Sequence, residues 1–327
     1  MSLPVFAQEA ETITSVDAGT SAAPVATEVV AAKAEPVDEQ EIITRLQIFL
    51  DQQNFGPGKI DGRWGEFTGK ALAKYAKAHG LTVDATIYDQ LPLAELHPIY
   101  ATYQIKAEDF TWVGPTAGKP AAQAKLKKLL YGEMLEFLEE RYHCDKDFLR
   151  KLNKGINMDA LVAGTEVRVP NVAPFKIEDI QAVAKFPEVP EFATRRIEVN
   201  RTTRMATLFD GEKIIAAFPI TPGSGQTPTP KGKWRIVGIT SLPNFRWDEG
   251  VLNHGVRTEK FFMLPPGPNN PVGVAWIALS KPGIGMHGTN NPATIGRAAS
   301  HGCMRMANWD AVRLAAMVTK NMSVSID

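Results

Sequence analysis

The side chains most able to do chemistry lie near the C-terminus, in two segments rich in histidine and glycine. The first is Met286-His287-Gly288-Thr289, and the second is Ser300-His301-Gly302-Cys303-Met304-Arg305-Met306. A cysteine attacks as its thiolate, and a free thiol with a pKa of about 8.5 is only a few per cent ionised at neutral pH. A nearby imidazole can accept the proton, and glycines leave backbone amides open to a developing oxyanion. Cys303 and its neighbours therefore have the groups that acyl transfer requires.

Other interpretations of these residues are weaker. A cysteine is more often a buried apolar residue, but histidine, glycine and arginine make a poor core environment around Cys303. His287, His301 and Cys303 could hold zinc, but the sequence offers no fourth ligand or second cysteine pair nearby. A C-x-x-C redox motif is missing. Cys144 lies in a predicted helix without glycines, which favours a structural role. We therefore expect neither a metal nor a cofactor.

Composition limits the classes of function. The chain has 327 residues, and its 36 basic and 36 acidic side chains give no net charge at pH 7. Nucleic acid, which is bound through its phosphates, is therefore not an expected partner. Hydrophobic residues make up 44% of the chain, enough for packed cores, and two cysteines are too few for a disulfide framework. No apolar run reaches the roughly 20 residues of a membrane helix, so no membrane span is expected.

Residues 1–40 are predicted to be a disordered tether that follows a removed signal peptide. Val5-Phe6-Ala7 is similar to the end of a secretory signal, although no basic region or apolar core precedes it. The residues that follow are rich in Ala, Val, Thr, Glu and Pro, a composition that does not fold alone. We therefore expect an exported protein of the periplasm or cell envelope. An arbitrary flexible start is the alternative.

Residues 41–98 are predicted to form a small helical module. Apolar residues from Ile42 to Leu50 recur at helical spacing, a turn follows, and a second helix ends at Gly80. The module resembles the helical peptidoglycan-binding domain in its pattern Asp61-Gly62-x-x-Gly65-x-x-Thr68. The resemblance implies glycan binding, and a helical bundle without a ligand is the alternative.

Residues 99–172 are predicted to form a second module in the order strand, helix, helix, strand. One strand covers Tyr103 to Lys106, and the last follows a turn at Gly164. This order resembles a LysM repeat, which binds N-acetylglucosamine polymers, with an insertion from Pro115 to Glu136. The module either binds glycan or only packs. Residues 173–190, which include prolines, are predicted to be a linker.

Residues 191–327 are predicted to contain many short strands. Strand patterns cover residues 197–200, 205–209, 214–220, 234–237 and 273–279, with a hairpin turn at Asp210-Gly211. Short strands with close turns favour a β-sandwich or a barrel-like sheet. Asn308 is expected to cap the N-terminus of one helix that follows it.

The third segment resembles the YkuD-type L,D-transpeptidase catalytic domain. The matching pattern runs from His287 to Met306 and includes Gly296 and the sequence Ser-His-Gly-Cys. Thr229-Pro230-x-Gly232 and the segment from Pro266 to Gly273 also match. The expected fold class is therefore multidomain α+β, with a mainly-β L,D-transpeptidase-type catalytic domain and small N-terminal helical and LysM-like modules.

The resemblance implies catalytic roles for five residues. Cys303 is the nucleophile, and His287 is the general base that takes its proton. The Gly288 carbonyl orients the His287 ring, as the third member of a triad does. The amides of Gly302 and Cys303 form the oxyanion hole, and His301 shapes the acyl site.

Substrate binding is expected from two further residues of the same motif. Arg305 either fixes a substrate carboxylate or braces the loop through a salt bridge. Ser300 is expected to hydrogen-bond within the loop rather than to react.

The implied substrate is peptidoglycan. Cys303 would attack a tetrapeptide donor, release D-Ala and form a thioester, which an amine acceptor would resolve. An L,D-carboxypeptidase or other hydrolase acting on the same substrate is one alternative. A non-catalytic scaffold that binds the cell wall is another.

Overall fold

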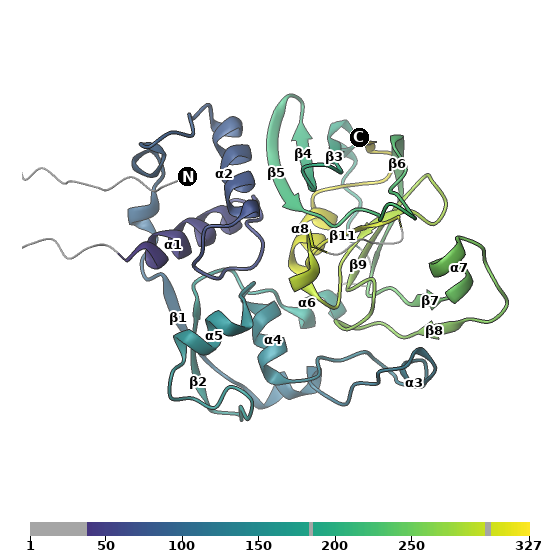
Figure 1. Cartoon of the computed structure of the whole chain (residues 1–327), viewed down its shortest axis with the longest axis horizontal. Helices are drawn as coiled ribbons and strands as arrows, with labels where there is room; N and C mark the ends of the chain where they lie inside the picture. Colours follow the sequence, from purple (N-terminus) through teal and green to yellow (C-terminus); the bar gives the residue numbers. More distant parts are fainter. Residues whose placement is uncertain (1–37, 183–185, 298–301) are drawn as a thin grey trace, which may run out of the picture.

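The computed structural model describes residues 38–182, 186–297 and 302–327. The predicted signal peptide and nearly all of the predicted tether lie outside these residues, as do Ser300 and His301. Figure 1 shows the three predicted segments as one arrangement, with the second segment beneath the first and third. Within the described part of the chain, no helix is both long enough and apolar enough to cross a membrane.

The first segment is helical, and Gln47 of its first helix bonds to residues of the motif. The side chain of Gln47 donates to Asp61 Oδ1 at 2.9 Å and to Thr68 Oγ1 at 3.2 Å, and its oxygen accepts the amides of Asp61 and Gly62. Gly80 ends the second helix in the left-handed conformation, as predicted. The helices are α1 (Glu39–Gln52), α2 (Glu66–His79) and the 3-10 turns η1 (Ile87–Gln90) and η2 (Leu93–Glu95).

The second segment has two antiparallel strands with helices between them. Two helices precede Asn153, with a break near His143. The chain leaves helical conformation at His143, where φ is 52°, and Asp145 begins the next helix by accepting the amide of Asp147. The elements are β1 (Tyr100–Gln104), η3 (Ala107–Trp112), α3 (Pro120–Gln123), α4 (Met134–Arg141), α5 (Lys146–Leu152) and β2 (Glu166–Pro170).

The insertion in the second segment contacts the third segment through its backbone. The amide of Leu129 donates to Pro266 O, and Leu129 O accepts the amide of Asn269. A Cβ on Gly267 would lie 2.2 Å from Leu129 O, so only glycine permits this approach. The predicted linker is also packed, because it contains α6 (Ile177–Ala182) and buries Ile177 and Ile180 in the core of the second segment.

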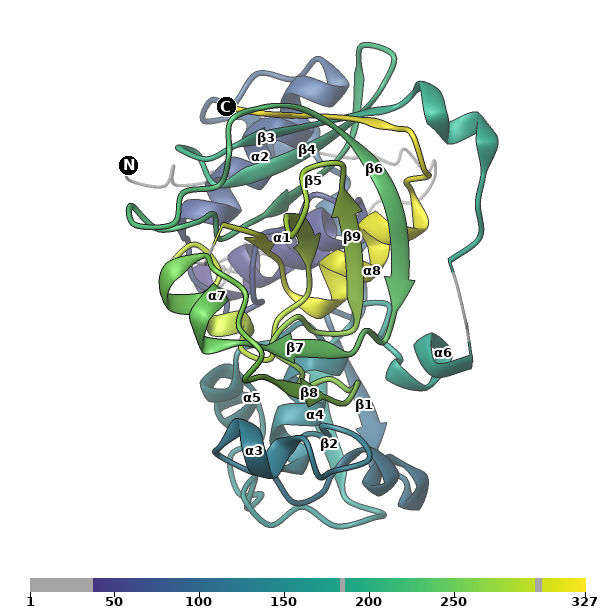
Figure 2. The same ribbon diagram turned by 90° about the vertical axis from the view of Figure 1, so that its right-hand side faces the viewer.

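The third segment forms one curled sheet of eight strands rather than two facing sheets (Figure 2). The strand order is β11-β10-β9-β6-β12-β3-β4-β5, and α8 packs against β9 and β10. Past β5, Thr221 exchanges two backbone hydrogen bonds of 2.9 and 3.0 Å with Arg305 on the opposite edge strand. The two edges of the sheet therefore meet, which makes the sheet barrel-like.

The elements of the third segment are bounded as follows. The sheet contains β3 (Arg196–Asn200), β4 (Met205–Asp210), β5 (Lys213–Pro219), β6 (Gly232–Ser241), β9 (Ala275–Leu279), β10 (Gly285–His287), β11 (Met304–Arg305) and β12 (Ser323–Ile326). A separate hairpin has β7 (Phe245–Trp247) and β8 (Phe262–Leu264). The helices are η4 (Pro190–Thr194), α7 (Glu249–His254), η5 (Pro292–Thr294) and α8 (Asn308–Ala316).

Asn308 does not cap α8, contrary to the expectation from sequence. Ala307 occupies the N-cap position, and Asn308 is the first residue of the helix. The Asn308 side chain is fully buried and bonds to groups outside the helix. Tertiary partners compete successfully for this carboxamide, which local sequence does not reveal.

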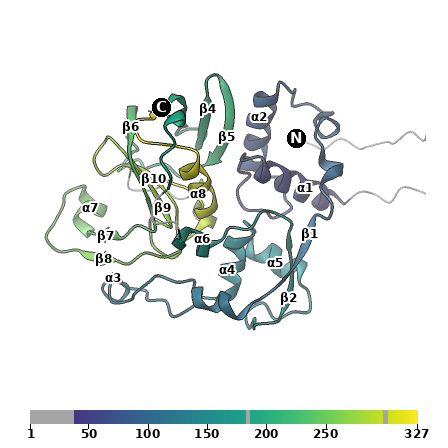
Figure 3. The same ribbon diagram turned by 180° about the vertical axis from the view of Figure 1, so that it is seen from behind.

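The three segments lie against one another (Figure 3), and hydrophobic cores join them. One core joins Leu46 and Phe49 of the first segment to Met205 and Ile214 on the sheet. The edge strand β5 is covered by the first segment, since Gly56 N donates to Ala217 O and Ala217 N donates to Asn54 O. A second core joins apolar side chains of the second segment to Val274 and Trp309. The covered strand edge and the common cores make the N-terminal segments part of the same folded body.

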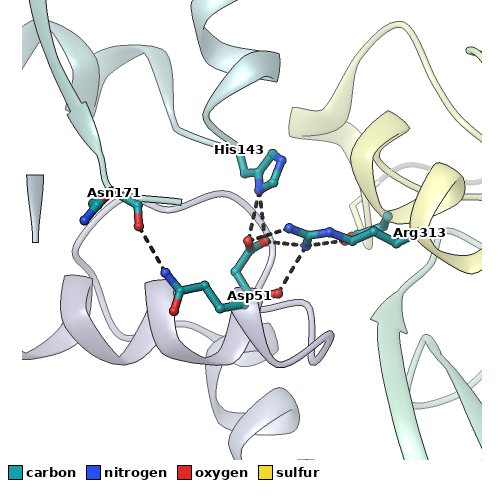
Figure 4. Close-up of polar contacts among 6 residues, drawn as sticks. Asp51, His143, Asn171 and Arg313 are labelled. Carbon is teal, nitrogen blue, oxygen red and sulfur yellow. Dashed lines mark hydrogen bonds and ion pairs between the residues drawn. The ribbon is translucent and has the colours of Figure 1, made fainter. Parts of the chain in front are cut away.

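A buried carboxylate links all three segments (Figure 4). Asp51 on α1 accepts from His143 Nδ1 at 3.0 and 3.1 Å and from both terminal nitrogens of Arg313 on α8 at 2.8 and 2.9 Å. Burial raises the pKa of Asp51, but His143 and Arg313 together hold it well below its ordinary value. The carboxylate is therefore charged at neutral pH and paired across the segments.

Removal of the first two segments is expected to prevent proper folding. A chain that begins at Phe186 would expose Met205, Ile214 and Trp309, which are buried against the missing segments. We expect this truncated chain to bind a hydrophobic dye and to elute as aggregate in size-exclusion chromatography. A chain that begins at Asp38 is the control and should behave as the full chain does. A soluble, monomeric truncation with a sharp thermal transition would contradict this prediction.

Asp51→Asn is expected to lower the free energy of unfolding by about 3 kcal/mol, because it leaves Arg313 without its buried counter-charge. Urea denaturation at pH 7 would measure the change. The control is Glu108→Gln, which removes an exposed ion pair of 4.0 Å with Lys106 and should change stability by less than about 1 kcal/mol. Equal stability of the two variants would mean that Asp51 does not hold the segments together.

Candidate active site

The site lies where strands β10 and β11 run side by side. They are parallel, with Met286 paired with Met304 and His287 paired with Arg305. Side chains alternate between the two faces of a strand, and register partners share a face. Met286 and Met304 are fully buried in the core of the sheet, so His287 and Arg305 lie on the opposite face. Cys303, one residue before β11, belongs to this second face.

His287 is held in one orientation by a backbone carbonyl. Its Nδ1 lies 2.6 Å from Gly288 O and must donate, because a carbonyl only accepts. Nε2 is then the unprotonated nitrogen. Burial lowers the pKa of His287 to about 4, with Gly288 raising it and the charge of Arg305 lowering it. The imidazole is therefore neutral at pH 7, as a proton acceptor must be.

Trp276 covers the His287 ring, and sequence reasoning missed this contact. Trp276 on β9 is the register partner of His287, and the two rings stack with centroids 5.3 Å apart at 19°. Ala275 and Ile277 beside it are buried in the core. That alternation in the sequence could have placed Trp276 on the face opposite the core. It could not have placed Trp276 against His287, because the pairing register is a tertiary property.

The thiol of Cys303 is partly buried and is protonated in the resting state. Burial raises its pKa to about 11, while a backbone hydrogen bond with Gly285 and the charge of Arg305 act to lower it. Cys303 Sγ donates to Gly283 O at 3.3 Å. The pair of His287 and Cys303 is therefore an imidazole and a thiol at neutral pH, rather than an imidazolium and a thiolate.

The backbone around Cys303 is constrained on both sides. Gly302 has φ of 108°, a conformation that L-residues rarely adopt, so the turn before Cys303 requires glycine. From the other edge of the sheet, Thr221 makes backbone hydrogen bonds to Arg305 of β11, and its hydroxyl accepts the amide of Gly296 at 2.7 Å. Gly296 in turn packs against Phe67 of α2, where a Cβ would lie 2.2 Å from the ring.

The structure brings together five predicted site residues on or beside β10 and β11, at one edge of the sheet: His287, Gly288, Gly302, Cys303 and Arg305. Ser300 and His301 lie outside the described residues. Cys144 is fully buried between α4 and α5, and burial raises the pKa of its thiol well above its ordinary value. Among the residues that the structure describes, which exclude His301, no group of three His, Cys, Asp or Glu side chains could hold a metal ion.

The comparison with protein families agrees with this geometry. Residues 194–326, which contain the whole curled sheet with β10 and β11, match the sequence model of YkuD, described as an L,D-transpeptidase catalytic domain.

This match supports a YkuD-type L,D-transpeptidase catalytic domain in residues 194–326.

Two Bacillus proteins are similar in sequence. A protein assigned as the L,D-transpeptidase YkuD of Bacillus licheniformis is 29% identical over 195 residues, which cover 60% of this chain and 94% of that protein. Its counterpart in Bacillus subtilis is 32% identical over 131 residues, 40% of this chain and 65% of that protein.

Solved structures of L,D-transpeptidases also match. The catalytic domain from Enterococcus faecium is 18% identical, with a TM-score of 0.31 over 41% of this chain and 98% of that domain. An L,D-transpeptidase from Mycobacterium smegmatis is 14% identical, with a TM-score of 0.34 over 51% of this chain and 64% of that one. The family match stops short of the first two segments, so it does not identify them.

The thiol of Cys303 is expected to be alkylated slowly at neutral pH. Since burial raises the pKa of Cys303 to about 11, the rate of its reaction with iodoacetamide should rise about tenfold per pH unit between pH 7 and 10. Mass mapping of the labelled peptide would measure the rate, and buried Cys144 should stay unlabelled. A rate that is constant above pH 7 would mean that the thiolate is already formed in the resting enzyme.

Proposed function

We propose that the transpeptidase domain is a cysteine acyltransferase that acts on peptidoglycan stem peptides. Cys303 attacks the carbonyl between the L-centre and D-Ala of a tetrapeptide donor, D-Ala leaves, and an amine acceptor takes the acyl group. The single observation that carries the proposal is the register of β10 and β11. It puts His287, with Nε2 unprotonated, on the same face as the thiol of Cys303.

His287 relays one proton in each of the two steps. As Sγ attacks the carbonyl carbon, Nε2 of His287 takes the thiol proton, and the amides of Gly302 and Cys303 stabilise the oxyanion. When the intermediate collapses, the C–N bond breaks, His287 returns the proton to the amine of D-Ala, and a thioester remains. An acceptor amine then attacks the thioester and gives its proton to His287, which passes it to Sγ as the C–S bond breaks and the thiol is restored.

Proton transfer and attack should occur together in this site. The charge of Arg305 lowers the pKa of both Cys303 and His287, so it favours the thiolate but opposes the imidazolium that would accompany it. A stable ion pair is therefore disfavoured before substrate binds. Arg305 is also suited to a substrate carboxylate, as the partner of a bidentate pair.

Water in place of the amine would make the same site an L,D-carboxypeptidase or another hydrolase. The reaction up to the thioester is identical, so the acceptor alone decides between transfer and hydrolysis. Peptidoglycan lies outside the cytoplasm, so we propose action in the cell envelope or periplasm. For the first segment, we propose a packing role in preference to glycan binding, because the motif residues Asp61 and Thr68 accept hydrogen bonds from Gln47 within the segment.

The proposal is tested by incubating the full chain with disaccharide-tetrapeptide and identifying the products by mass spectrometry. Cross-linked dimers and free D-Ala are expected. Cys303→Ala should lower the rate at least about 1000-fold, as removal of a nucleophile does. Cys144→Ala, the control, should retain most of the activity at 25 °C.

Each other outcome has a distinct meaning. Trimmed tripeptides without dimers would identify a hydrolase. Equal activity of Cys303→Ala and the parent would refute the assignment of the nucleophile. No product from any of the three proteins, with binding to sacculi retained, would favour the non-catalytic scaffold.

A further inference from the structure

One peptide group orients the proposed catalytic base. The carbonyl of Gly288 accepts from His287 Nδ1 at 2.6 Å, and the amide of the same peptide unit, which belongs to Thr289, donates to Asn308 Oδ1 at 3.2 Å. A peptide unit is planar, and its C=O and N–H point in opposite directions. The unit is therefore held at both ends, and any rotation of it would turn the carbonyl away from His287.

The carboxamide of Asn308 is tightly enclosed. Its oxygen also accepts the amide of Val274 at 3.2 Å. A Cβ built on either Gly273 or Gly288 would lie 2.0 Å from this oxygen, so glycines on both sides make room for it. The enclosure leaves Asn308 little freedom to shift, and the two backbone amides require its oxygen end to face Thr289 and Val274.

Glu140 holds the other end of the carboxamide. It lies near the end of α4 in the second segment, is only 4% exposed, and its Oε2 accepts from Asn308 Nδ2 at 2.8 Å. Its other oxygen accepts from Tyr131 Oη at 2.6 Å. An acceptor at this position requires the NH₂ end of Asn308 to face Glu140, which turns the oxygen toward Thr289.

We propose that Glu140 is a positioning residue for the catalytic base, acting on His287 through Asn308 and the Gly288–Thr289 peptide. The proposal rests on the proposed function, since it takes His287 to be the base. It gives the second segment a direct part in the active site, because the acceptor that completes the chain of contacts comes from that segment. Among the described residues of the third segment, Pro268 O also accepts from Asn308 Nδ2, but at 3.4 Å against 2.8 Å for Glu140.

The test compares three variants on α4 in the full-length chain. Glu140→Leu removes the acceptor, and Glu140→Gln keeps a carbonyl oxygen for Asn308 to donate to. Glu139→Leu is the matched control, because Glu139 pairs with Lys59 of the first segment at 3.0 Å and does not contact Asn308. Acylation of Cys303 by a carbapenem, which presents a strained acyl group, would be followed by intact-protein mass.

A misdirected base should slow acylation without weakening binding. We expect Glu140→Leu to lower the maximal acylation rate by between about 10-fold and 100-fold, the range expected when a catalytic group is misplaced by up to 1 Å. The concentration of drug that gives half-maximal rate should stay within about twofold of the parent value. Glu140→Gln should restore most of the rate, and Glu139→Leu should match the parent at a temperature where all variants are folded.

Two measurements separate positioning from loss of stability. The ¹⁵N chemical shifts of His287 should indicate protonation at Nδ1 in the parent and in Glu140→Gln, and a mixture of tautomers in Glu140→Leu. In the parent, the Thr289 amide should exchange with solvent as slowly as amides in the core of the sheet. This exchange measurement needs no variant, so it tests the proposal even if Glu140→Leu does not fold.

Several results would overturn the proposal. They are equal acylation rates for Glu140→Leu and Glu139→Leu, an unchanged His287 tautomer in Glu140→Leu, or fast exchange of the Thr289 amide in the parent. Failure of the proposed function looks different, because the parent itself would then not be acylated at Cys303. Normal acylation of the parent with equal rates in the two leucine variants would refute the role of Glu140 alone.

Discussion

The buried carboxylate of Asp51 is the contact on which the arrangement of the three segments depends. A charged carboxylate without partners is too costly to bury, and the partners of Asp51 come from two other segments, as His143 and Arg313. The charged and fully paired state of Asp51 therefore forms only when α1, the turn after α4 and helix α8 have come together. This contact makes the folding of the segments interdependent.

Helix α8 connects the packing of the three segments to the candidate active site. Arg313, in its second turn, pairs with the first segment, and Asn308, at its start, pairs with Glu140 of the second. The position of the helix sets where Asn308 meets the peptide that holds His287. Glu140 of the second segment thus bears on the geometry of His287, which lies more than 140 positions later in the sequence.

The buried acids differ in charge according to whether a cation reaches them. Arg313 lowers the pKa of Asp51, whereas burial raises that of Glu140 to about 8 with neutral hydrogen-bond donors as its partners. Glu140 is thus largely protonated at neutral pH and still offers a carbonyl oxygen to Asn308. As pH rises from about 4 toward 8, the unfolded chain gives up this proton before the folded one does, so the contribution of Glu140 to stability falls.

Sequence alone identified the proposed chemistry, because the residues that carry it are close together along the chain. The spacing of His287 and Cys303 and the glycines beside them was sufficient to predict the transpeptidase family, which the family comparison supports. Strand alternation and the helix end at Gly80 were also predictable, since both depend on local conformational preferences. The roles of the individual site residues remain predictions.

Only the tertiary structure decided how the site is supported. The stacking of Trp276 on His287 depends on strand register, and the role of Asn308 depends on Glu140, which lies 168 residues earlier in the sequence. Local sequence also does not reveal that the backbone of Leu129, in the predicted insertion, bonds to the third segment. Sequence patterns report preferences over a few residues, whereas buried hydrogen bonds and ion pairs are chosen by whichever partners folding brings within reach.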